Sequence, residues 1–129
     1  MENAAAPTPS DSTQLAVDRT RLAHDRTLMA WVRTATSLIS FGFTIYKFFQ
    51  TLQEKGEARE GRLLGPREFA LIMIGIGLTA LALATIQHRR EMMKMRARYP
   101  EVPYSLTTVL AGLVTILGIV AFVAVAFRQ

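Results

Sequence analysis

The stretch "LMAWVRTATSLISFGFTIYKFF", residues 28–49, decides the fold, because it is apolar enough to cross a membrane and yet carries Arg33 and Lys47. A helix needs about 20 mostly apolar residues to span roughly 30 Å of hydrocarbon. Two further stretches, residues 69–86 and 106–127, are of similar length and contain no charged residue. The sequence therefore predicts an all-α integral membrane protein with three transmembrane helices.

Composition agrees with this class. Half of the 129 residues are hydrophobic and only 19% are charged, yet the net charge is +5, so apolar and basic residues must be segregated along the chain. Because cysteine is absent, disulfides, thiolate metal sites and cysteine nucleophiles are excluded. The first twelve residues include two prolines and no apolar core, so we expect a disordered tail rather than a cleaved signal.

The remaining residues, 13–129, form a single membrane domain in this prediction. Asp11 and Ser12 are candidate N-caps for its first helix. Gly65-Pro66 marks the start of the second span, and Pro100 and Pro103 end a basic helix that continues from it. The predicted segments are an amphipathic helix at 13–27, a span at 28–49, an outer loop at 50–67, a span at 68–87, a cytoplasmic basic helix and turn at 88–104, and a span at 105–127.

Orientation follows from the lysines and arginines that flank the spans. Nine lie before or within the start of the first span and in the second connection, namely Arg19, Arg21, Arg26, Arg33, Arg89, Arg90, Lys94, Arg96 and Arg98. Six lie in the first connection and at the C-terminus, namely Lys47, Lys55, Arg59, Arg62, Arg67 and Arg128. The more basic side faces the cytoplasm, so we expect the N-terminus inside and the C-terminus outside.

An arginine stripe precedes and enters the first span. Arg19, Arg26 and Arg33 are seven residues apart, and the same count reaches Ser40 and Lys47. At about 1.5 Å per residue, the stripe extends roughly 42 Å. A straight helix drifts by about 20° per heptad, so the stripe keeps to one face only where helices supercoil around neighbours. A second heptad series, Leu15, Leu22 and Met29, accompanies it. The pattern favours a packed homo-oligomer.

Simpler interpretations of the same residues stay open. Arg33 and Lys47 are close enough to the ends of the span to reach the interface, where Trp31 and Tyr46 would be ordinary anchors. Asp18 and Asp25 can form exposed salt bridges of little energetic value. Small residues such as Gly42 and the Gly75-x-x-x-Thr79 pair are typical of close helix packing.

Catalytic and metal sites are not expected. His24 and His88 lack the spacing of metal ligands, and no catalytic triad, glycine-rich phosphate loop or carboxylate pair with a base is present in a suitable context. We therefore expect no enzyme activity, no cofactor and no nucleic-acid partner.

Two stretches, "LAHDRTLMAWVRTATSLISFGFTIYKFF" and "IQHRREMMKMRARYP", resemble the YidH-like family of small inner-membrane proteins, catalogued as a domain of unknown function. The hallmark of that family is Leu-Ala-x-Glu-Arg-Thr-x-Leu-Ala-Trp-x-Arg-Thr, entering the first of three spans. This chain has Asp25 where the family usually has glutamate. The resemblance covers residue 22 to the end of the chain, and it implies a bacterial inner-membrane location.

The fold is also similar to the membrane module of the vacuolar transporter chaperone complex, a eukaryotic polyphosphate polymerase. There, five three-helix modules surround a polyphosphate pore lined by basic residues of the first helix. The resemblance implies a pentamer-like assembly in which Arg26 matches a family arginine, Arg19 matches a lysine, and Arg89 or Arg90 matches a basic residue. Arg33 has no basic counterpart in the small vacuolar subunit. The chain has no polymerase domain.

These observations lead to the hypothesis of a homo-oligomeric anion conduit, because stacked rings of positive charge favour anions. Phosphate or polyphosphate is the cargo implied by resemblance. The candidate pore-lining or anion-binding residues are Arg19, Arg26, Arg33, Lys47, Arg89 and Arg90. The candidate inter-subunit or supporting residues are Asp18, Asp25, Thr27 and Trp31.

The alternative hypothesis is a membrane scaffold or accessory subunit that conducts nothing. Its basic residues would bind anionic lipid headgroups or a larger partner, and apolar side chains such as Phe41, Phe43 and Phe48 would fill the axis.

Overall fold

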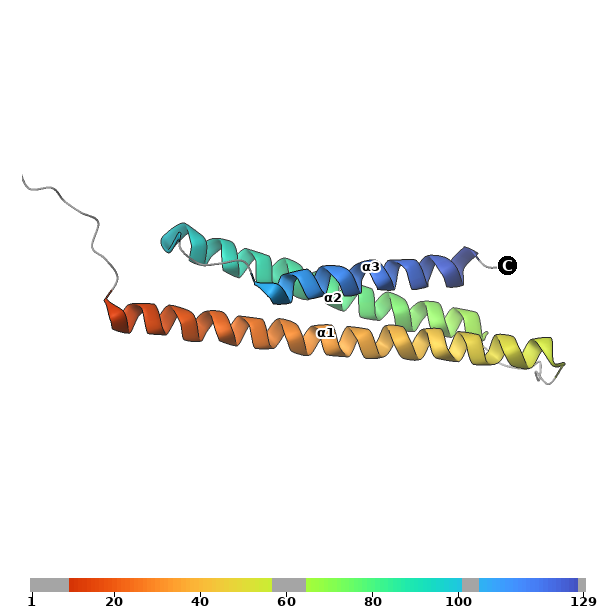
Figure 1. The fold of residues 1–129 in the computed structure, drawn as a ribbon. Helices are drawn as coiled ribbons and strands as arrows, with labels where there is room; N and C mark the ends of the chain where they lie inside the picture. The colour runs from red at the N-terminus through yellow and green to blue at the C-terminus, as the bar shows by residue number, and fades with distance from the viewer. Residues whose placement is uncertain (1–9, 57–64, 101–104, 128–129) are drawn as a thin grey trace, which may run out of the picture.

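Three helices make up the part of the chain that the structure describes. The computed structural model describes residues 10–56, 65–100 and 105–127, and all regular structure in those ranges is helical. The elements are α1 (Asp11–Glu54), α2 (Pro66–Arg98) and α3 (Leu106–Phe127). They lie side by side along most of the length of α2 and α3 (Figure 1). Each contains a stretch long and apolar enough to span a membrane.

Helix α1 is a single unbroken element. Its 44 residues extend about 66 Å, roughly twice the thickness of the hydrocarbon core. One helix therefore covers both the segment predicted as amphipathic (13–27) and the first predicted span, and its last turn reaches Glu54, inside the range expected as a loop. The tail at 1–9 lies outside the described residues. The amphipathic character of residues 13–27 stays a prediction.

The capping predictions at the start of α1 were off by one or two residues. The N-cap is Ser10, and Asp11 and Ser12 already belong to the first turn. The Ser10 hydroxyl contacts the hydroxyls of Ser12 and Thr13 at 3.0 and 2.9 Å rather than a backbone N–H. The first turn is closed by the backbone carbonyl of Ser10, which accepts hydrogen bonds from the N–H groups of Thr13 and Gln14 at 2.8 and 3.1 Å.

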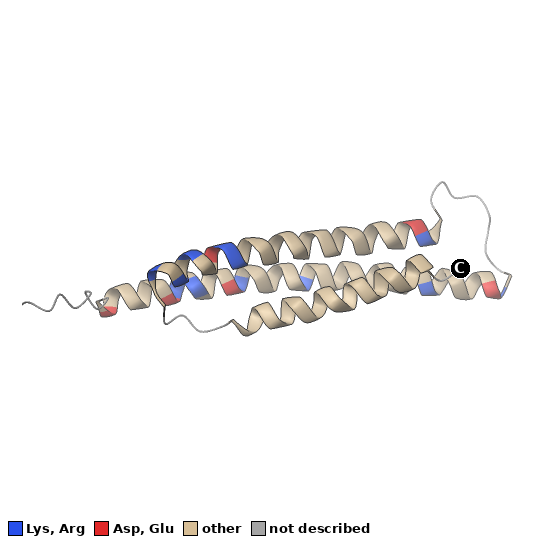
Figure 2. Ribbon diagram, turned by 90° about the horizontal axis from the view of Figure 1, so that it is seen from above, with Lys and Arg blue, Asp and Glu red and all other residues tan. Residues whose placement is uncertain are grey.

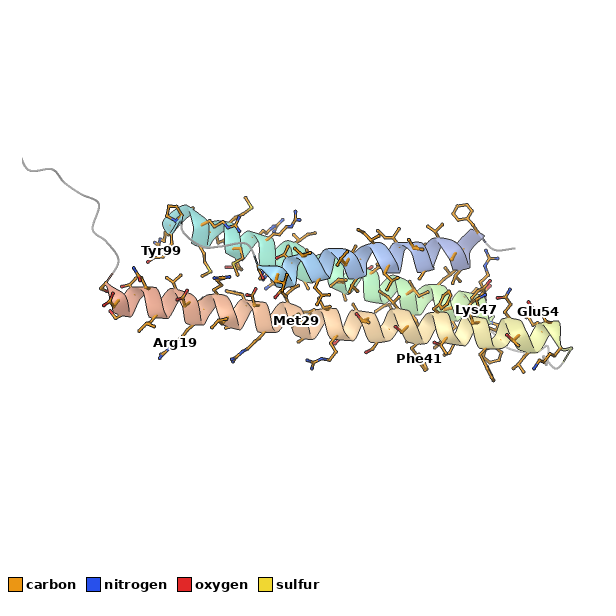
Figure 3. The ribbon with its side chains drawn as sticks, viewed as in Figure 1. Arg19, Met29, Phe41, Lys47, Glu54 and Tyr99 are labelled. Carbon is orange, nitrogen blue, oxygen red and sulfur yellow. The ribbon has the colours of Figure 1, made fainter. Side chains whose placement is uncertain are left out.

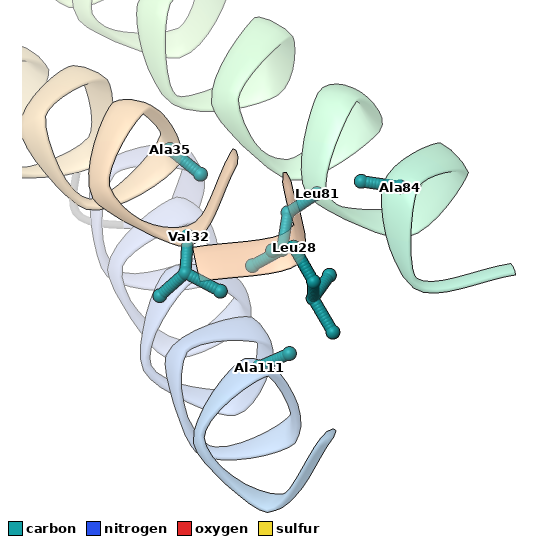
Figure 4. Close-up of a cluster of buried hydrophobic side chains, with 6 residues drawn as sticks. All are labelled: Leu28, Val32, Ala35, Leu81, Ala84 and Ala111. Carbon is teal, nitrogen blue, oxygen red and sulfur yellow. The ribbon is translucent and has the colours of Figure 1, made fainter. Parts of the chain in front are cut away.

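Buried residues on each helix follow a spacing of three and four, or of seven. They are Leu28, Val32, Ala35, Ile39, Gly42 and Tyr46 on α1, Ala70, Ile74, Gly77, Leu81, Ala84, His88 and Met92 on α2, and Ala111, Gly118 and Val125 on α3. This is the 3.5-residue repeat of helices that pack at small crossing angles. Figure 4 shows one layer, in which Leu28 and Val32 meet Leu81 and Ala111.

Glycines bring the helices into close contact. A Cβ placed on Gly77 would lie 3.2 Å from the Ala35 carbonyl oxygen, and one on Gly118 would lie 2.6 Å from Leu78 Cδ2. Gly42 is equally close to α2. By contrast, a Cβ placed on Gly75 would have no atom of another helix within 4 Å, so the Gly75-x-x-x-Thr79 pair does not bring two helices of this chain into close contact. The prediction for Gly42 is therefore confirmed, whereas Gly77 and Gly118 were not selected from the sequence.

The two ends of the bundle differ in charge. Lysines and arginines gather where α1 begins and α2 ends, and the middle of α2 and α3 has none (Figure 2). We call residues 11–27 of α1 and 88–98 of α2 the basic end. At the opposite end, Arg67 of α2 donates hydrogen bonds to the carbonyls of Val125 (3.2 Å) and Ala126, closing the last turn of α3.

Candidate functional site

One side of α1 is covered by neither α2 nor α3. Arg26 and Arg33 each stand two residues before a core position, Leu28 or Ala35, which places them about 200° around the helix from the core. All three arginines of the stripe are exposed, and Arg19 projects away from α2 and α3 (Figure 3). We define the uncovered face of α1 by its exposed polar residues, which are Arg19, Arg26, Arg33, Ser37, Ser40 and Thr44.

The outward sides of the other two helices are apolar. Within the spans they expose Phe69, Ile72, Ile76, Leu83 and Ile86 on α2, and Leu106, Val109, Leu110, Leu113, Ile116, Leu117, Ile119, Val120, Phe122, Val123 and Phe127 on α3. Apolar side chains in such density on a helix surface match lipid. Together with three helices of sufficient length, they show a multi-pass membrane protein.

Two hydroxyl groups of the uncovered face, those of Ser37 and Thr44, are satisfied inside α1. Ser37 donates to the Arg33 carbonyl at 3.0 Å, and Thr44 donates to the Ser40 carbonyl at 2.7 Å. Such bonds let serine and threonine enter a span at little cost. The guanidinium of Arg33 has no comparable partner, because no carboxylate in the described ranges lies within 4.0 Å of it or of Arg19 and Arg26. Within the ranges that the structure describes, the three arginines of the stripe therefore have no carboxylate partner.

Lys47 continues the stripe at the opposite end of the span. It is half-buried, and its ammonium donates to the Gln50 side chain at 3.3 Å. It borders a shallow hollow of about 450 Å³ lined by Phe43, Thr44, Lys47, Phe48, Thr51, Leu52 and Lys55. The hollow combines aromatic rings with two ammonium groups, a combination suited to an amphiphile with an anionic head.

A polar junction joins all three helices at the basic end. Ser105, just before α3, donates a hydrogen bond of 2.7 Å to Asp25 Oδ1 on α1. The same oxygen lies 3.6 Å from His88 Nε2 on α2. His88 is only 4% exposed, and neither ring nitrogen has a hydrogen-bond partner in the described residues. We call Asp25, His88 and Ser105 the polar junction.

Charge at the junction depends on His88, which lies two residues beyond the charge-free stretch of α2. Burial lowers the pKa of His88 below its ordinary value, Asp25 opposes this, and His24 contributes a further lowering. Neutral His88 is therefore favoured in the folded chain. Sequence reasoning considered His88 only as a metal ligand and missed its burial beside Asp25, although the residue lies four positions after Ala84 and so continues the buried series of α2.

The structure groups some predicted site residues and separates others. Asp25 faces the polar junction, so the contacts that the structure gives it lie within one chain. Arg89 and Arg90 follow buried His88 and are exposed on other sides of α2, away from the side that packs on α1. They do not share the uncovered face of α1.

The supporting residues named from the sequence are all on α1. Asp18 and Trp31 are exposed, and Thr27 is exposed with its hydroxyl donating to the Ala23 carbonyl at 3.1 Å. No cluster of three or more histidine, aspartate or glutamate side chains occurs in the part of the chain that the structure describes. Asp18, Thr27 and Trp31 therefore belong to no such cluster among the described residues.

Comparison with known proteins places this membrane protein in a family. The profile of the family described as Domain of unknown function (DUF202) matches residues 19–94, more than half of the chain. The chain belongs to this family, in agreement with the YidH-like resemblance. The match begins at the first arginine of the stripe and ends on the basic end of α2. No curated protein and no solved structure matches the chain.

Proposed function

We propose that the protein is a non-enzymatic, homo-oligomeric anion conduit of the bacterial inner membrane, with the α1 helices around its axis. The observation that carries this proposal is the contrast between helices in the membrane. Along the span, the uncovered face of α1 carries polar side chains beside exposed Phe41 and Phe48, whereas the outward sides of α2 and α3 are largely apolar. A chain so built is stable when lipid covers α2 and α3 and when water or other copies cover α1.

Energetics support this arrangement. An arginine near the membrane interior costs about 2.5 to 3.5 kcal/mol on insertion scales, and such residues usually face a bundle interior or water. Copies of α1 around an axis would turn Arg19, Arg26 and Arg33 into three successive rings of positive charge. Such rings attract anions and repel cations. Ser37, Ser40 and Thr44 would carry the polar lining onward toward Lys47.

The cargo in this proposal is phosphate or polyphosphate, which the resemblance to the vacuolar complex favours. The basic end would face the cytoplasm, with the C-terminus outside, following the bias of lysine and arginine. Arg89 and Arg90, exposed on α2, would collect polyanions near the entrance. Any polymer would be made by another protein.

A second candidate function is a non-conducting scaffold that binds anionic lipid. Two observations favour it. Phe41 and Phe48 are 54% and 60% exposed, and Phe41 projects from the same side of α1 as Arg19 (Figure 3). Phenylalanine rings on the axis would close it to ions. The hollow beside Lys47 and Lys55 would then hold a lipid headgroup.

Flux measurements on purified protein in liposomes test the proposal. Chloride, orthophosphate and short polyphosphate are compared with potassium, for the unchanged chain, Arg26→Glu and the control Arg98→Glu. Both variants replace an arginine by a glutamate and so change the net charge equally. Arg98 serves as the control because it is exposed on α2 and lies off the stripe. The conduit predicts anion-selective flux that Arg26→Glu abolishes and Arg98→Glu preserves. No flux from an intact oligomer would contradict it and leave the lipid-binding scaffold.

A further inference from the structure

Two more heptad series flank the arginine stripe on α1. On one side are Leu15, Leu22 and Met29, which we call the leucine ridge, with 60%, 56% and 37% of their surface exposed. On the other side are Ala16, Ala23 and Ala30, all exposed, which we call the alanine flank. At about 100° per residue, Leu22 lies about 40° to one side of Arg26, and Ala23 lies about 60° to the other.

The alanine flank needs no polar partner. Thr20, Thr27 and Thr34 follow its alanines by four residues, and their hydroxyls donate to the carbonyls of Ala16, Ala23 and Ala30 at 3.0, 3.1 and 3.1 Å. The same bond thus recurs every seven residues. It leaves a surface of methyl groups with no free hydroxyl donor, and another helix can approach such a surface closely.

Two residues of the leucine ridge, Leu15 and Leu22, lie outside the predicted span, where lipid does not cover them. Leu22 and Leu15 precede the first residue of the span, Leu28, by six and thirteen residues, or about 9 and 20 Å along the helix. Helix α1 continues without a break from Asp11 into the predicted span (Figure 1). A segment joined to the span in this way would extend out of the membrane and would not lie flat on its surface. Exposed leucines at such regular spacing in water indicate a protein partner.

The chain itself offers the complementary surface. The ridge is large and the alanine flank is small, both repeat every seven residues over the same three heptads, and the arginine stripe separates them. We propose that copies of this chain meet through parallel, head-to-tail contacts of α1, with the leucine ridge of one copy packed on the alanine flank of the next. Contacts of this kind between two different flanks close into rings, and this one turns Arg19, Arg26 and Arg33 toward the axis.

The angle between the two surfaces supports a second copy as the partner. The leucine ridge and the alanine flank lie about 100° apart around α1, with the arginines between them. Copies that meet through two surfaces at this angle close into a ring of roughly four or five. Asp18 is exposed about 40° beyond Leu22, on the side away from the arginines, so in the ring it lies on the outer side of the contact and does not face the axis.

Disulfide cross-linking tests this contact, because the chain contains no cysteine of its own. Leu22→Cys and Ala23→Cys copies, carrying different tags, are co-expressed and their membranes are oxidised. The head-to-tail contact predicts a cross-linked product that contains both tags, and little product when either variant is expressed alone. Leu15→Cys with Ala16→Cys repeats the test one heptad earlier. Met93→Cys, exposed on the basic end of α2, reports random collisions.

Two results would overturn the inference. Efficient cross-linking of Leu22→Cys with itself would show a two-fold contact between ridges, since a disulfide needs Cβ atoms about 3.5–4.5 Å apart. Mixed cross-linking no greater than that of Met93→Cys would show that ridge and flank do not meet. Both positions are exposed, so neither substitution disturbs the core.

The inference rests on the homo-oligomer of the proposed function but not on conduction. Cross-linked rings without anion flux would keep this contact and reject the conduit. Anion flux without the mixed cross-link would keep the conduit and reject this contact.

Discussion

Helices α1 and α3 present opposite surfaces to their surroundings. The exposed side chains of α3 are mostly leucine, isoleucine, valine and phenylalanine, whereas the uncovered face of α1 carries arginine, serine and threonine. Both helices bury a narrow heptad seam on the inside. Since the inner sides follow the same packing rule, the difference lies in what each outer side meets. Lipid suits α3, and protein or water suits α1.

The largest expected effect is a difference in the amount of folded protein when an arginine is placed on the outer side of α3 or on the uncovered face of α1. Gly118 packs beside Ile39, so Leu117 and Ser40 lie at similar depth. Leu117→Arg should reduce the inserted, folded protein by the equivalent of about 2.5–3.5 kcal/mol, because its charge would face lipid. Ser40→Arg should reduce it much less. The measurement is the folded fraction recovered from membranes, and equal losses would remove the contrast between α1 and α3.

A somewhat smaller effect is expected from filling the seam of α3. A side chain at Gly118 meets Leu78 and Ile39 at 2.6 and 2.8 Å, so Gly118→Leu should destabilise the bundle by about 1–3 kcal/mol. Gly112 on the same helix is exposed, and a Cβ placed on it would have no neighbouring atom within 4 Å. Gly112→Leu is therefore the matched control. Thermal denaturation in detergent should separate the two variants. Similar midpoints would show that α3 does not pack through Gly118.

Disrupting the polar junction should destabilise the bundle less than filling the seam at Gly118. Asp25→Ala removes the acceptor of the Ser105 hydrogen bond and the carboxylate beside buried His88, for a loss of about 1–2 kcal/mol. Glu54→Ala removes an exposed acid at the other end of α1 and should change stability by less than about 0.5 kcal/mol. If the two denaturation midpoints coincide, the junction does not hold the helices together.

The smallest effect is a dependence of stability on pH. The pKa of His88 is lowered in the folded chain, so below its ordinary value of about 6.5 the unfolded chain binds a proton that the folded chain resists. Stability should therefore be complete above about pH 6.5 and fall as the pH decreases toward the folded pKa. His88→Gln should flatten this part of the denaturation curve. An unchanged slope in the variant would assign the dependence to other groups.

Much of the fold could be predicted because membrane insertion is written locally in the sequence. Long apolar stretches indicate spans wherever they occur, and three of them, two without any charge and one containing Arg33 and Lys47, predicted three helices. The seven-residue spacing placed Arg19, Arg26 and Arg33 on one face for the same reason, since helical period is local. The start of α1 at Asp11 was missed by two residues because several polar residues there can cap a helix.

The long-range contacts could not be predicted. Asp25 and Ser105 are 80 residues apart, and no pattern in the sequence around either residue indicates that they are in contact. Histidine after an apolar stretch is ordinary, so His88 became informative only once α2 was seen to continue its buried series. Likewise, Gly77 and Gly118 were selected by the register between helices, which the Gly75-x-x-x-Thr79 pattern does not contain.

The most direct test of the central claim is the accessibility of single cysteines to a membrane-impermeant thiol reagent. Ser40→Cys and Leu117→Cys lie at similar depth, and the chain has no cysteine to interfere. A thiol reacts as its thiolate, which forms in water and not in lipid. The account predicts labelling of Ser40→Cys and protection of Leu117→Cys in intact membranes. Protection of both cysteines would contradict the conduit, because its axis requires that the uncovered face of α1 meets water.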